Sequence, residues 1–422
     1  MKSADHHIIQ LKGAESADFA AMVAKLGGQI ERRLPDVKLV VVKGLSTSAA
    51  STLASRTDVS QVTLDSRRQW IPHTAARHLQ VARATAPAHV DQSGAAFFAA
   101  YQWNMRVTKA NQAWLTTPEG RGAKVYVLDT GIDPNHLDLA GLVDLSHSTS
   151  FAEAEPNDIK DYESHGTFVS AIIASNGIGV ASVAPLSTIT AVKVLDQSGS
   201  GSFADVISGI VYAANQGADV INMSLGSFAD LTNPGDRTLV AQLQAAIAYA
   251  RLKGAIVVAA AGNDGLDLRT LPPQDIEVPA ELLGVVSVGA TGPVDQMNFD
   301  RLASYSNYGW NGVPIGGVQV FAPGGDFEDP NQIADLIISA CSEYSPFDCG
   351  DGQSYLFGDG TSFSSPMVSG EAAVLRSIVG SSTLASLVTN SCVLQGTDVI
   401  GPSGTFGEGR MDVVKAASCA HR

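Results

Sequence analysis

Three short segments carry residue types that could together perform acyl transfer. Asp129 follows the apolar run 124–128, His165 opens an apolar stretch, and Ser362 follows Gly360-Thr361 before another such stretch. Each residue alone is weak evidence, because Asp is common in turns and a Ser at a helix start is usually a cap. As a set, however, a carboxylate, an imidazole and a hydroxyl are the groups used in nucleophilic catalysis by serine.

The order of these residues narrows the class of enzyme. Asp, His and Ser follow one another along the chain, whereas α/β-hydrolases place Ser first and use a GxSxG turn, which this sequence lacks. Asn263 lies just past the apolar run 255–261, where its amide could donate to a developing oxyanion. A backbone N–H at the helix start of Ser362 could do the same.

The elements expected from residue 101 onward would bring these residues to one edge of a sheet. Apolar runs without polar alternation are typical of parallel strands covered on both faces, and ligands bind beyond the carboxyl ends of such strands. We therefore predict an α/β fold with a doubly wound, mostly parallel sheet. The expected strands are 124–128, 189–195, 219–223, 255–261, 285–288 and 318–321, and the expected helices are 165–174, 203–216 and 238–253.

The first 70 residues predict a separate small domain. Strands are expected at 7–11, 29–34, 37–43 and 59–64, with one helix capped by Ser16 and another at 49–55. The order β-α-β-β-α-β is that of a ferredoxin-like α+β domain.

Residues 71–100 are Ala-rich and show no dependable strand. This composition predicts an exposed, cleavable linker. The expected division is 1–70, 71–100 and 101–422.

Composition and charge exclude several classes of protein. Of 422 residues 45% are hydrophobic and only 16% charged, which predicts a well-filled core rather than disorder. No apolar run reaches the length of a membrane-spanning helix. The net charge of −15 disfavours nucleic acid and anionic membranes as partners.

That charge is unevenly distributed along the chain. Residues 1–100 carry 12 basic and 8 acidic residues (+4), and residues 101–422 carry 15 and 34 (−19). Opposite signs suggest two parts that face each other or one part that detaches, although a chance surface bias gives the same numbers.

The four cysteines bear on the cellular compartment. An even number without a CxxC spacing favours disulfides over a zinc site, with buried free thiols as the alternative. Pairing by proximity is the simplest of the three connectivities, and it joins Cys341 with Cys349 and Cys392 with Cys419. Met1 is followed by polar residues, so the protein is either intracellular or has lost a signal peptide. We expect a secreted protein.

The sequence resembles the subtilisin-type serine proteases, the subtilases, across residues 101–418. The resemblance is carried by 127–133, 165–175, 220–226, 258–265, 321–324 and 358–370. It implies that Ser362 is the nucleophile, His165 the general base and acid, and Asp129 the group that orients the imidazole. Asn263 and the N–H of Ser362 would form the oxyanion hole. The beginning of the chain resembles the inhibitory propeptide of the same family.

The resemblance also implies a substrate-binding cleft. Ser224, Leu225 and Gly226 on one side, and Ala260, Ala261 and Gly262 on the other, would hold an extended peptide as an added strand and wall its specificity pocket. Their small side chains leave a wide pocket. Asp264 would lie at the pocket rim, where we expect it to favour basic residues.

The sequence departs from the family pattern at several positions. Phe168 replaces a frequent His, and Phe363 and Ser364 stand where Met and Ala are common, with small effects on the rate expected.

Many subtilases bind calcium, and Asp138 matches one ligand, but the partner loop 175–180 is two residues short. The acidic stretch 153–163 is an alternative calcium site or a solvated face. No cofactor is required for the chemistry.

These inferences lead to one favoured function and several alternatives. We expect a monomeric, secreted endopeptidase made as a self-processing zymogen, which cleaves polypeptides and is inhibited by its own amino-terminal domain. A catalytically silent peptide-binding module on the same fold is the main alternative. An esterase of another fold is disfavoured by the order of the three residues, and the amino-terminal domain could instead be a permanent interaction domain.

Overall fold

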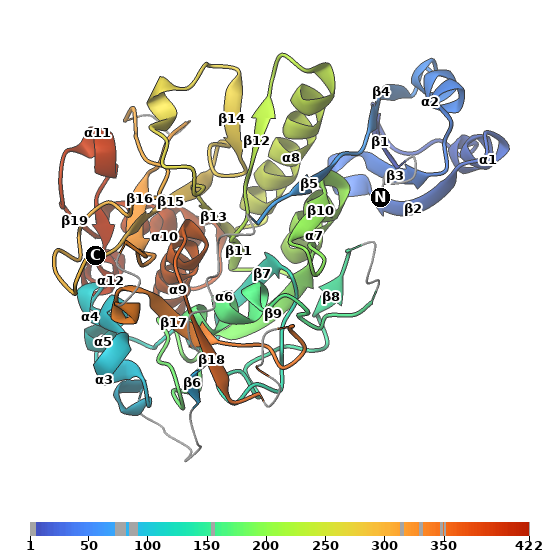
Figure 1. Ribbon diagram of the computed structural model, residues 1–422. Helices are drawn as coiled ribbons and strands as arrows, with labels where there is room; N and C mark the ends of the chain where they lie inside the picture. Colours follow the sequence, from blue (N-terminus) through green and yellow to red (C-terminus); the bar gives the residue numbers. More distant parts are fainter. Residues whose placement is uncertain are drawn as a thin grey trace.

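The computed structural model describes residues 6–71, 82–83, 92–152, 157–312, 316–328, 332–346, 349 and 352–421. Figure 1 shows a small amino-terminal unit, in blue, that projects from one side of a much larger α/β unit.

The amino-terminal unit has the predicted element order. It consists of β1 (His7–Leu11), α1 (Phe19–Lys25), β2 (Gln29–Leu34), η1 (Pro35–Val37), β3 (Leu39–Lys43), α2 (Thr47–Ala54) and β4 (Val59–Leu64). The strands form an antiparallel sheet in the order β2-β3-β1-β4, and its inner face packs on Phe19 of α1 and Leu53 of α2. The predicted cap at Ser16 is wrong, because the helix begins after Asp18 and the Ser16 hydroxyl bonds the carboxylates of Asp18 and Asp58.

The larger unit is built on a nine-stranded sheet in the order β19-β20-β16-β15-β13-β11-β7-β9-β8. Only β19 runs antiparallel to its neighbour, which confirms the mostly parallel sheet. The strands are β7 (Lys124–Asp129), β8 (Thr149–Ser150), β9 (Thr188–Lys193), β11 (Val220–Met223), β13 (Ile256–Ala260), β15 (Val285–Thr291), β16 (Val320–Pro323), β19 (Thr397–Asp398) and β20 (Arg410–Met411).

Helices cover both faces of this sheet, as predicted. Alternate residues of β7 enter different apolar clusters: Val125 and Val127 pack with α6 and α9, and Tyr126 and Leu128 pack with α7 and α8. The helices are α3 (Phe98–Tyr101), α4 (Trp103–Val107), α5 (Ala110–Ala113), α6 (His165–Ile173), α7 (Phe203–Asn215), α8 (Pro234–Leu252), α9 (Thr361–Val379), α10 (Thr383–Gln395), α11 (Ser403–Phe406) and α12 (Val413–Ala420). Shorter turns are η2 (Gln92–Gly94), η3 (Leu268–Thr270) and η4 (Ile333–Asp335).

Short strands border the sheet and join distant segments. They are β5 (Arg67–Gln69) with β10 (Ser200–Ser202), β12 (Ser227–Asp230) with β14 (Asp275–Val278), and β6 (Ala82–Arg83) with β18 (Ser354–Gly358), which also pairs with β17 (Ile337–Ala340). The expectation of no strand in 71–100 is therefore wrong at β6. A sequence cannot show that the free edge of β18 offers backbone partners there. Residues 72–81 and 84–91 of the predicted linker lie outside the described residues.

The two predicted disulfides are present. Cys341 is bonded to Cys349, and Cys392 of α10 is bonded to Cys419 of α12. None of the four cysteines is free, which excludes the alternative of buried thiols.

The oppositely charged parts of the chain face each other. Arg32 pairs with Asp205 at 2.7 Å, Arg68 pairs with Asp236 at 2.5 Å, and Arg67 pairs with Asp196. In each pair the cation comes from the first 70 residues, and the carboxylate comes from the larger unit. An apolar contact accompanies them, because residues of η1 and β3 share one cluster with α7 and α8.

No helix within the described ranges is long and apolar enough to cross a membrane.

A buried ion pair ties α9 to the sheet. Arg376 Nη2 lies 2.8 Å from Asp219 Oδ1, with side-chain exposures of 1% and 4%, and the other oxygen of Asp219 accepts the N–H of Lys124. Removal of one partner leaves an uncompensated buried charge.

We predict that Arg376→Ala lowers the free energy of unfolding by about 3–5 kcal/mol. The matched control is Arg33→Ala, because the side chain of Arg33 is 50% exposed and pairs with Glu15 in water. The control should change stability by less than about 1 kcal/mol. Chemical denaturation measures both, and equal effects of the two variants would contradict the account.

Candidate active site

Asp129 occupies the carboxyl end of β7, near the middle of the sheet. Its side chain is 1% exposed, and Oδ1 accepts the N–H of Thr130 at 2.7 Å. The turn that follows needs glycine. A Cβ at Gly131, whose φ is +122°, would lie 2.6 Å from the carbonyl oxygen of Ile159. Gly166 of α6 approaches this turn so closely that its own Cβ would lie 2.2 Å from Gly131 O. These glycines allow the start of α6 to meet the end of β7.

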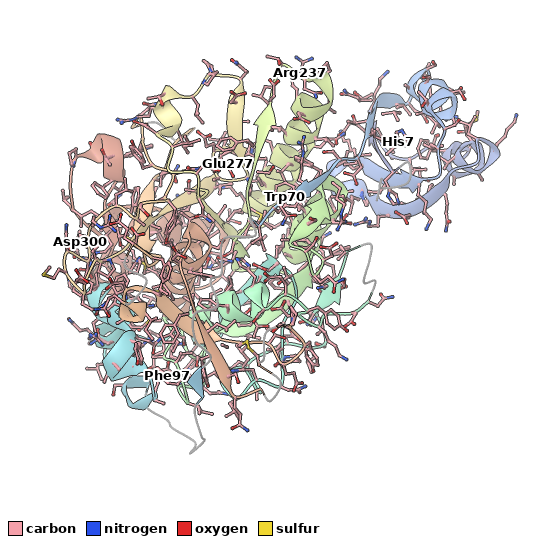
Figure 2. All side chains as sticks on the ribbon, viewed as in Figure 1. His7, Trp70, Phe97, Arg237, Glu277 and Asp300 are labelled. Carbon is pink, nitrogen blue, oxygen red and sulfur yellow. A yellow bond between two sulfur atoms is a disulfide. The ribbon has the colours of Figure 1, made fainter. Side chains whose placement is uncertain are left out.

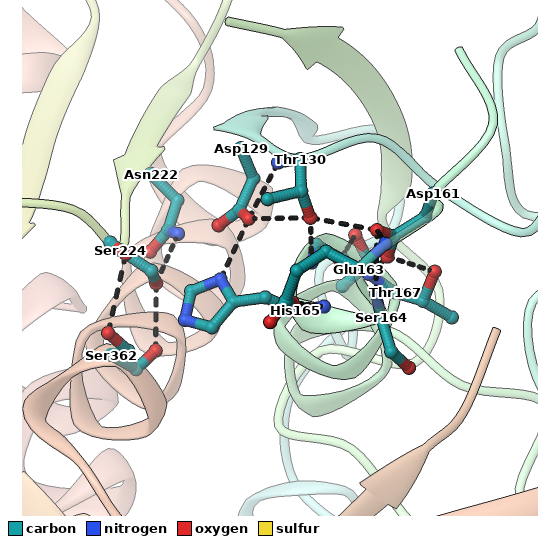
Figure 3. Close-up of polar contacts among 12 residues, drawn as sticks. Asp129, Thr130, Asp161, Glu163, Ser164, His165, Thr167, Asn222, Ser224 and Ser362 are labelled. Carbon is teal, nitrogen blue, oxygen red and sulfur yellow. Dashed lines mark hydrogen bonds and ion pairs between the residues drawn. The ribbon is translucent and has the colours of Figure 1, made fainter. Parts of the chain in front are cut away.

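His165, the first residue of α6, is thereby placed against Asp129. Its Nδ1 lies 2.7 Å from Asp129 Oδ1, and its side chain is 0% exposed. Figure 3 shows the imidazole between Asp129 and Ser362, with the other ring nitrogen turned toward the serine side. That nitrogen, Nε2, is buried and has no hydrogen-bond partner among the described residues.

The surroundings of His165 favour its protonated form. Burial lowers the pKa of His165, but the charge and hydrogen bond of Asp129 outweigh it, so the pKa lies above its usual value. The backbone N–H of His165 also donates to Glu163 Oε2 at 2.7 Å. Burial raises the pKa of Glu163 to about 7. An imidazole held in this way can accept a proton at Nε2 and keep it beside a negative charge.

Ser362 is the second residue of α9 and projects toward the same space. Its side chain is almost wholly buried, and Oγ donates to the backbone oxygen of Ser224 at 3.3 Å. The hydroxyl is thus not bonded to His165 in this structure. Catalytic hydrogen bonds are often long or misaligned before substrate binds, and rotation about χ1 moves the hydroxyl between its acceptors.

Asn263 lies opposite, just past the end of β13. Its Oδ1 accepts both the N–H of Thr361 at 2.9 Å and the hydroxyl of Thr361 at 2.8 Å. Because its oxygen is engaged by α9, the amide presents Nδ2 as its donor. Asn263 and Ser362 line the same cavity, where this Nδ2 and the backbone N–H of Ser362 could hold an oxyanion.

That cavity has a volume of about 190 Å³, several times the roughly 30 Å³ that one water occupies in the liquid. The predicted residues that line it are Leu225, Gly226, Ala260, Gly262, Asn263, Asp264 and Ser362. Ser224 and Ala261, which were also predicted, lie behind its wall: the Ser224 hydroxyl donates to Ser362 O, and Ala261 joins an apolar cluster.

Several residues that line the cavity were not predicted from the sequence. They are Gln69, Trp70, Ser227, Phe228, Glu277 and Thr361. Thr361 adjoins Ser362 and could have been proposed from its place in the same segment. Gln69, Trp70 and Glu277 come from elements whose pairing partners are distant in sequence, and no local pattern marks them.

Trp70 lies along the cleft as an extended segment. Its backbone N–H donates to Gly199 O, and its backbone oxygen accepts the N–H of Gly226, each at 3.0 Å. The indole Nε1 donates to Gly201 O at 3.0 Å, and the ring packs edge-on against Phe203 at 5.1 Å. Residues 67–70 therefore lie as an added strand between residues 199–202 and Gly226, of which Gly226 lines the cavity.

Two departures from the family pattern contact each other. The rings of Phe168 and Phe363 lie 4.2 Å apart between centroids, and Phe363 lies 5.8 Å from the ring of His165. The two aromatic side chains fill one space behind the imidazole, so they act as a pair.

Asp138 does not fit a calcium site. Its carboxylate accepts the backbone N–H groups of Ile178, Gly179 and Val180 at 2.7–2.9 Å, and the hydroxyl of Tyr355 at 2.8 Å. Calcium needs oxygen ligands, whereas this loop points hydrogen-bond donors at the carboxylate. The loop shortened by two residues thus closes on Asp138 directly.

The alternative calcium site is not supported by the geometry either. Both oxygens of Asp161 accept hydrogen bonds from Thr130, Ser164 and Thr167. Residues 153–156 lie outside the described residues. Within the part of the chain that the structure describes, no cluster of three or more His, Cys, Asp or Glu could hold a metal.

A doubly wound parallel sheet with Asp129, His165 and Ser362 at one edge is typical of a serine hydrolase. A sequence model described as the subtilase family matches residues 120–408. The chain belongs to this family, and it is a subtilisin-type serine endopeptidase.

Known relatives and solved structures agree with this assignment. The chain is 35% identical over 324 residues to a thermophilic serine proteinase of Bacillus sp. strain AK1, covering 76% of this chain and 68% of the relative. It is 34% identical over 322 residues to thermitase of Thermoactinomyces vulgaris, covering 76% and 97%. The structure of the epidermin leader peptide processing serine protease (EpiP) of Staphylococcus aureus aligns with a TM-score of 0.79 at 25% identity, over 99% of each chain.

We predict that Asp129→Asn lowers kcat for a peptide substrate by about 10⁴-fold, the effect of the equivalent change in another serine protease, because the amide no longer fixes the imidazole tautomer or stabilises its charged form. Steady-state kinetics on the purified variant measures the effect. Asp144→Asn is the control, since Asp144 bonds the exposed His147 instead. Loss of less than tenfold in Asp129→Asn would contradict the account.

We predict that Asp138→Asn lowers the free energy of unfolding by about 1–3 kcal/mol, because buried N–H donors lose their acceptor. The difference from the wild type should be the same in calcium as in a chelator, since the carboxylate bonds protein donors. Thermal unfolding in both buffers checks this. If the chelator abolished the difference, Asp138 would be a calcium ligand after all.

Proposed function

We propose that this chain is a secreted serine endopeptidase made as a self-processing zymogen. The observation that carries the proposal is the buried Asp129–His165 hydrogen bond, which leaves His165 Nε2 turned toward Ser362 and without another partner among the described residues. The substrates are polypeptides. The enzyme acts as a monomer and needs no cofactor for the chemistry.

The proposed reaction has two halves. Ser362 Oγ attacks the carbonyl carbon of the scissile bond while His165 Nε2 takes the hydroxyl proton. Asn263 and the Ser362 N–H hold the negative oxygen of the tetrahedral intermediate. His165 then gives its proton to the leaving amine, which departs and leaves an acyl-enzyme. A water activated by His165 releases the second product and restores Ser362.

The amino-terminal unit is proposed to be the inhibitor of the enzyme before processing. Trp70 takes backbone hydrogen bonds that an extended substrate would need, and β5 pairs with β10 beside it. The Arg–Asp pairs at the interface strengthen this association, and Asp196, Asp205 and Asp236 would all lose their arginine partners on release. Cleavage between residues 71 and 100 would detach it.

Secretion is supported by the disulfides, which persist in oxidising compartments. The peptide-binding module remains the second candidate, and it is supported by Trp70, whose backbone oxygen accepts the N–H of Gly226 at the cavity. A fluorophosphonate separates the two functions, since only an activated serine reacts with it.

We predict that the wild type loses roughly 70–100 residues on incubation, as expected for cleavage in an exposed linker. Ser362→Ala should stay whole because it lacks the nucleophile. Intact-mass spectrometry measures both, and Ser377→Ala, near the end of the same helix, should process like the wild type. Processing of Ser362→Ala at the wild-type rate would contradict the proposal.

A further inference from the structure

Glu277 lines the same cavity as Ser362 but has no part in the chemistry described above. It belongs to β14 and is paired with Phe228 of β12, the strand that begins directly after Leu225 and Gly226. Figure 2 labels Glu277 in the interior of the molecule, beside the ribbon of β14 and above Trp70. Its side chain is buried, with 2% of its surface exposed.

One oxygen of the buried Glu277 carboxylate lacks a partner within the part of the chain that the structure describes. Oε2 is enclosed and finds no hydrogen-bond partner among the described residues. The carboxylate occupies the space beside Gly226, where a Cβ would lie 2.3 Å from Oε1. Buried carboxylates are normally hydrogen-bonded or paired, so this one needs an explanation.

The neighbouring Glu281 differs from Glu277 in its hydrogen bonds. Its Oε2 accepts the N–H of Glu277 and its Oε1 accepts the N–H of Gly317, each at 2.9 Å. Both of its oxygens therefore have backbone partners. Glu277 is also buried, but it lines the cavity.

Two acidic residues line the cavity. Asp264 is exposed at its rim, and Glu277 lies buried at its inner wall. None of the described lining residues is a Lys, Arg or His. Burial, with the nearby charges of Asp264 and Glu281, raises the pKa of Glu277 well above its usual value. A cation that entered the cavity would stabilise the ionised carboxylate.

We propose that Glu277 is the specificity-determining residue of this cavity and pairs with an Arg or Lys side chain on the amino-terminal side of the scissile bond. This deepens the proposed function and rests on it. The planar guanidinium can bond both oxygens of one carboxylate, which favours Arg over Lys. Asp264 at the rim adds attraction for a basic side chain as it enters. The preference for basic residues that the sequence analysis assigned to Asp264 is then due mainly to Glu277.

The first test uses matched peptides that differ only in Arg, Lys, Leu or Gln at that position. The wild type should prefer Arg over Leu in kcat/KM by at least about 10²-fold. Glu277→Gln keeps the shape and should lower kcat/KM for the Arg peptide by about 10²–10³-fold, because one partner of a buried charge pair is removed. The Leu peptide should change by less than about threefold. Glu281→Gln is the control and should keep the wild-type Arg-to-Leu ratio.

Fluorophosphonate labelling of each variant shows whether Ser362 is active, so loss of specificity is distinguished from loss of the proposed function. An enzyme that labels but cleaves Leu as well as Arg, or a Glu277→Gln ratio equal to that of the wild type, would overturn the proposal. Preference for Leu or Gln would show that Glu277 stays protonated and only fills space.

The second test does not depend on catalysis. Benzamidine and the uncharged benzamide are compared by calorimetry on full-length Ser362→Ala. Benzamidine should bind at least about tenfold more tightly, and the difference should vanish when Glu277→Gln is added. Equal affinities in Ser362→Ala would overturn the proposal even if the protein proved to be a binding module.

Discussion

The arrangement of the rest of the site depends on the hydrogen bond between Asp129 and His165. A carboxylate and an imidazole can be buried together only where both are held at bonding distance and the carboxylate is otherwise supported. The end of β7 supplies the carboxylate, and the close approach of α6 at Gly131 and Gly166 supplies the imidazole. The parallel sheet then brings β13 and α9 to the same edge, which places Asn263 and Ser362 across from the ring.

A segment of the same chain, β5 with Trp70, occupies part of the substrate-binding cleft. β5 and Trp70 continue the amino-terminal unit into the space between residues 199–202 and Gly226, where backbone groups would otherwise be open to an added strand. The same edge therefore serves inhibition before cleavage and substrate binding after it in the proposed function. The interface ion pairs hold the amino-terminal unit in this position, and they connect its basic charge with the acidic larger unit.

The sequence was informative where structure is local and uninformative where it depends on distant pairing. Six strands of the sheet, the two disulfides and the segments around Asp129, His165 and Ser362 were predictable, because apolar runs and short motifs mark them. The two-residue strands β8, β19 and β20 were not predicted. Trp70, Glu277 and β6 reach their places through partners far away in the chain, so no local pattern reveals them. Asp138 matched a ligand position, but the donors of loop 175–180 face it, and only the fold shows their direction.

In the proposed mechanism His165, held by Asp129, activates Ser362. The most direct measurement is the rate of fluorophosphonate labelling against pH, with the adduct located by peptide mapping. The raised pKa of His165 means that its neutral form, which is the base, is lost as the pH falls through a value above the usual 6.5 or so. We expect an adduct on Ser362 and a labelling rate that falls as the pH is lowered, with a midpoint above about 6.5. A rate that stays constant between about pH 5 and 8, or an adduct on another residue, would contradict it.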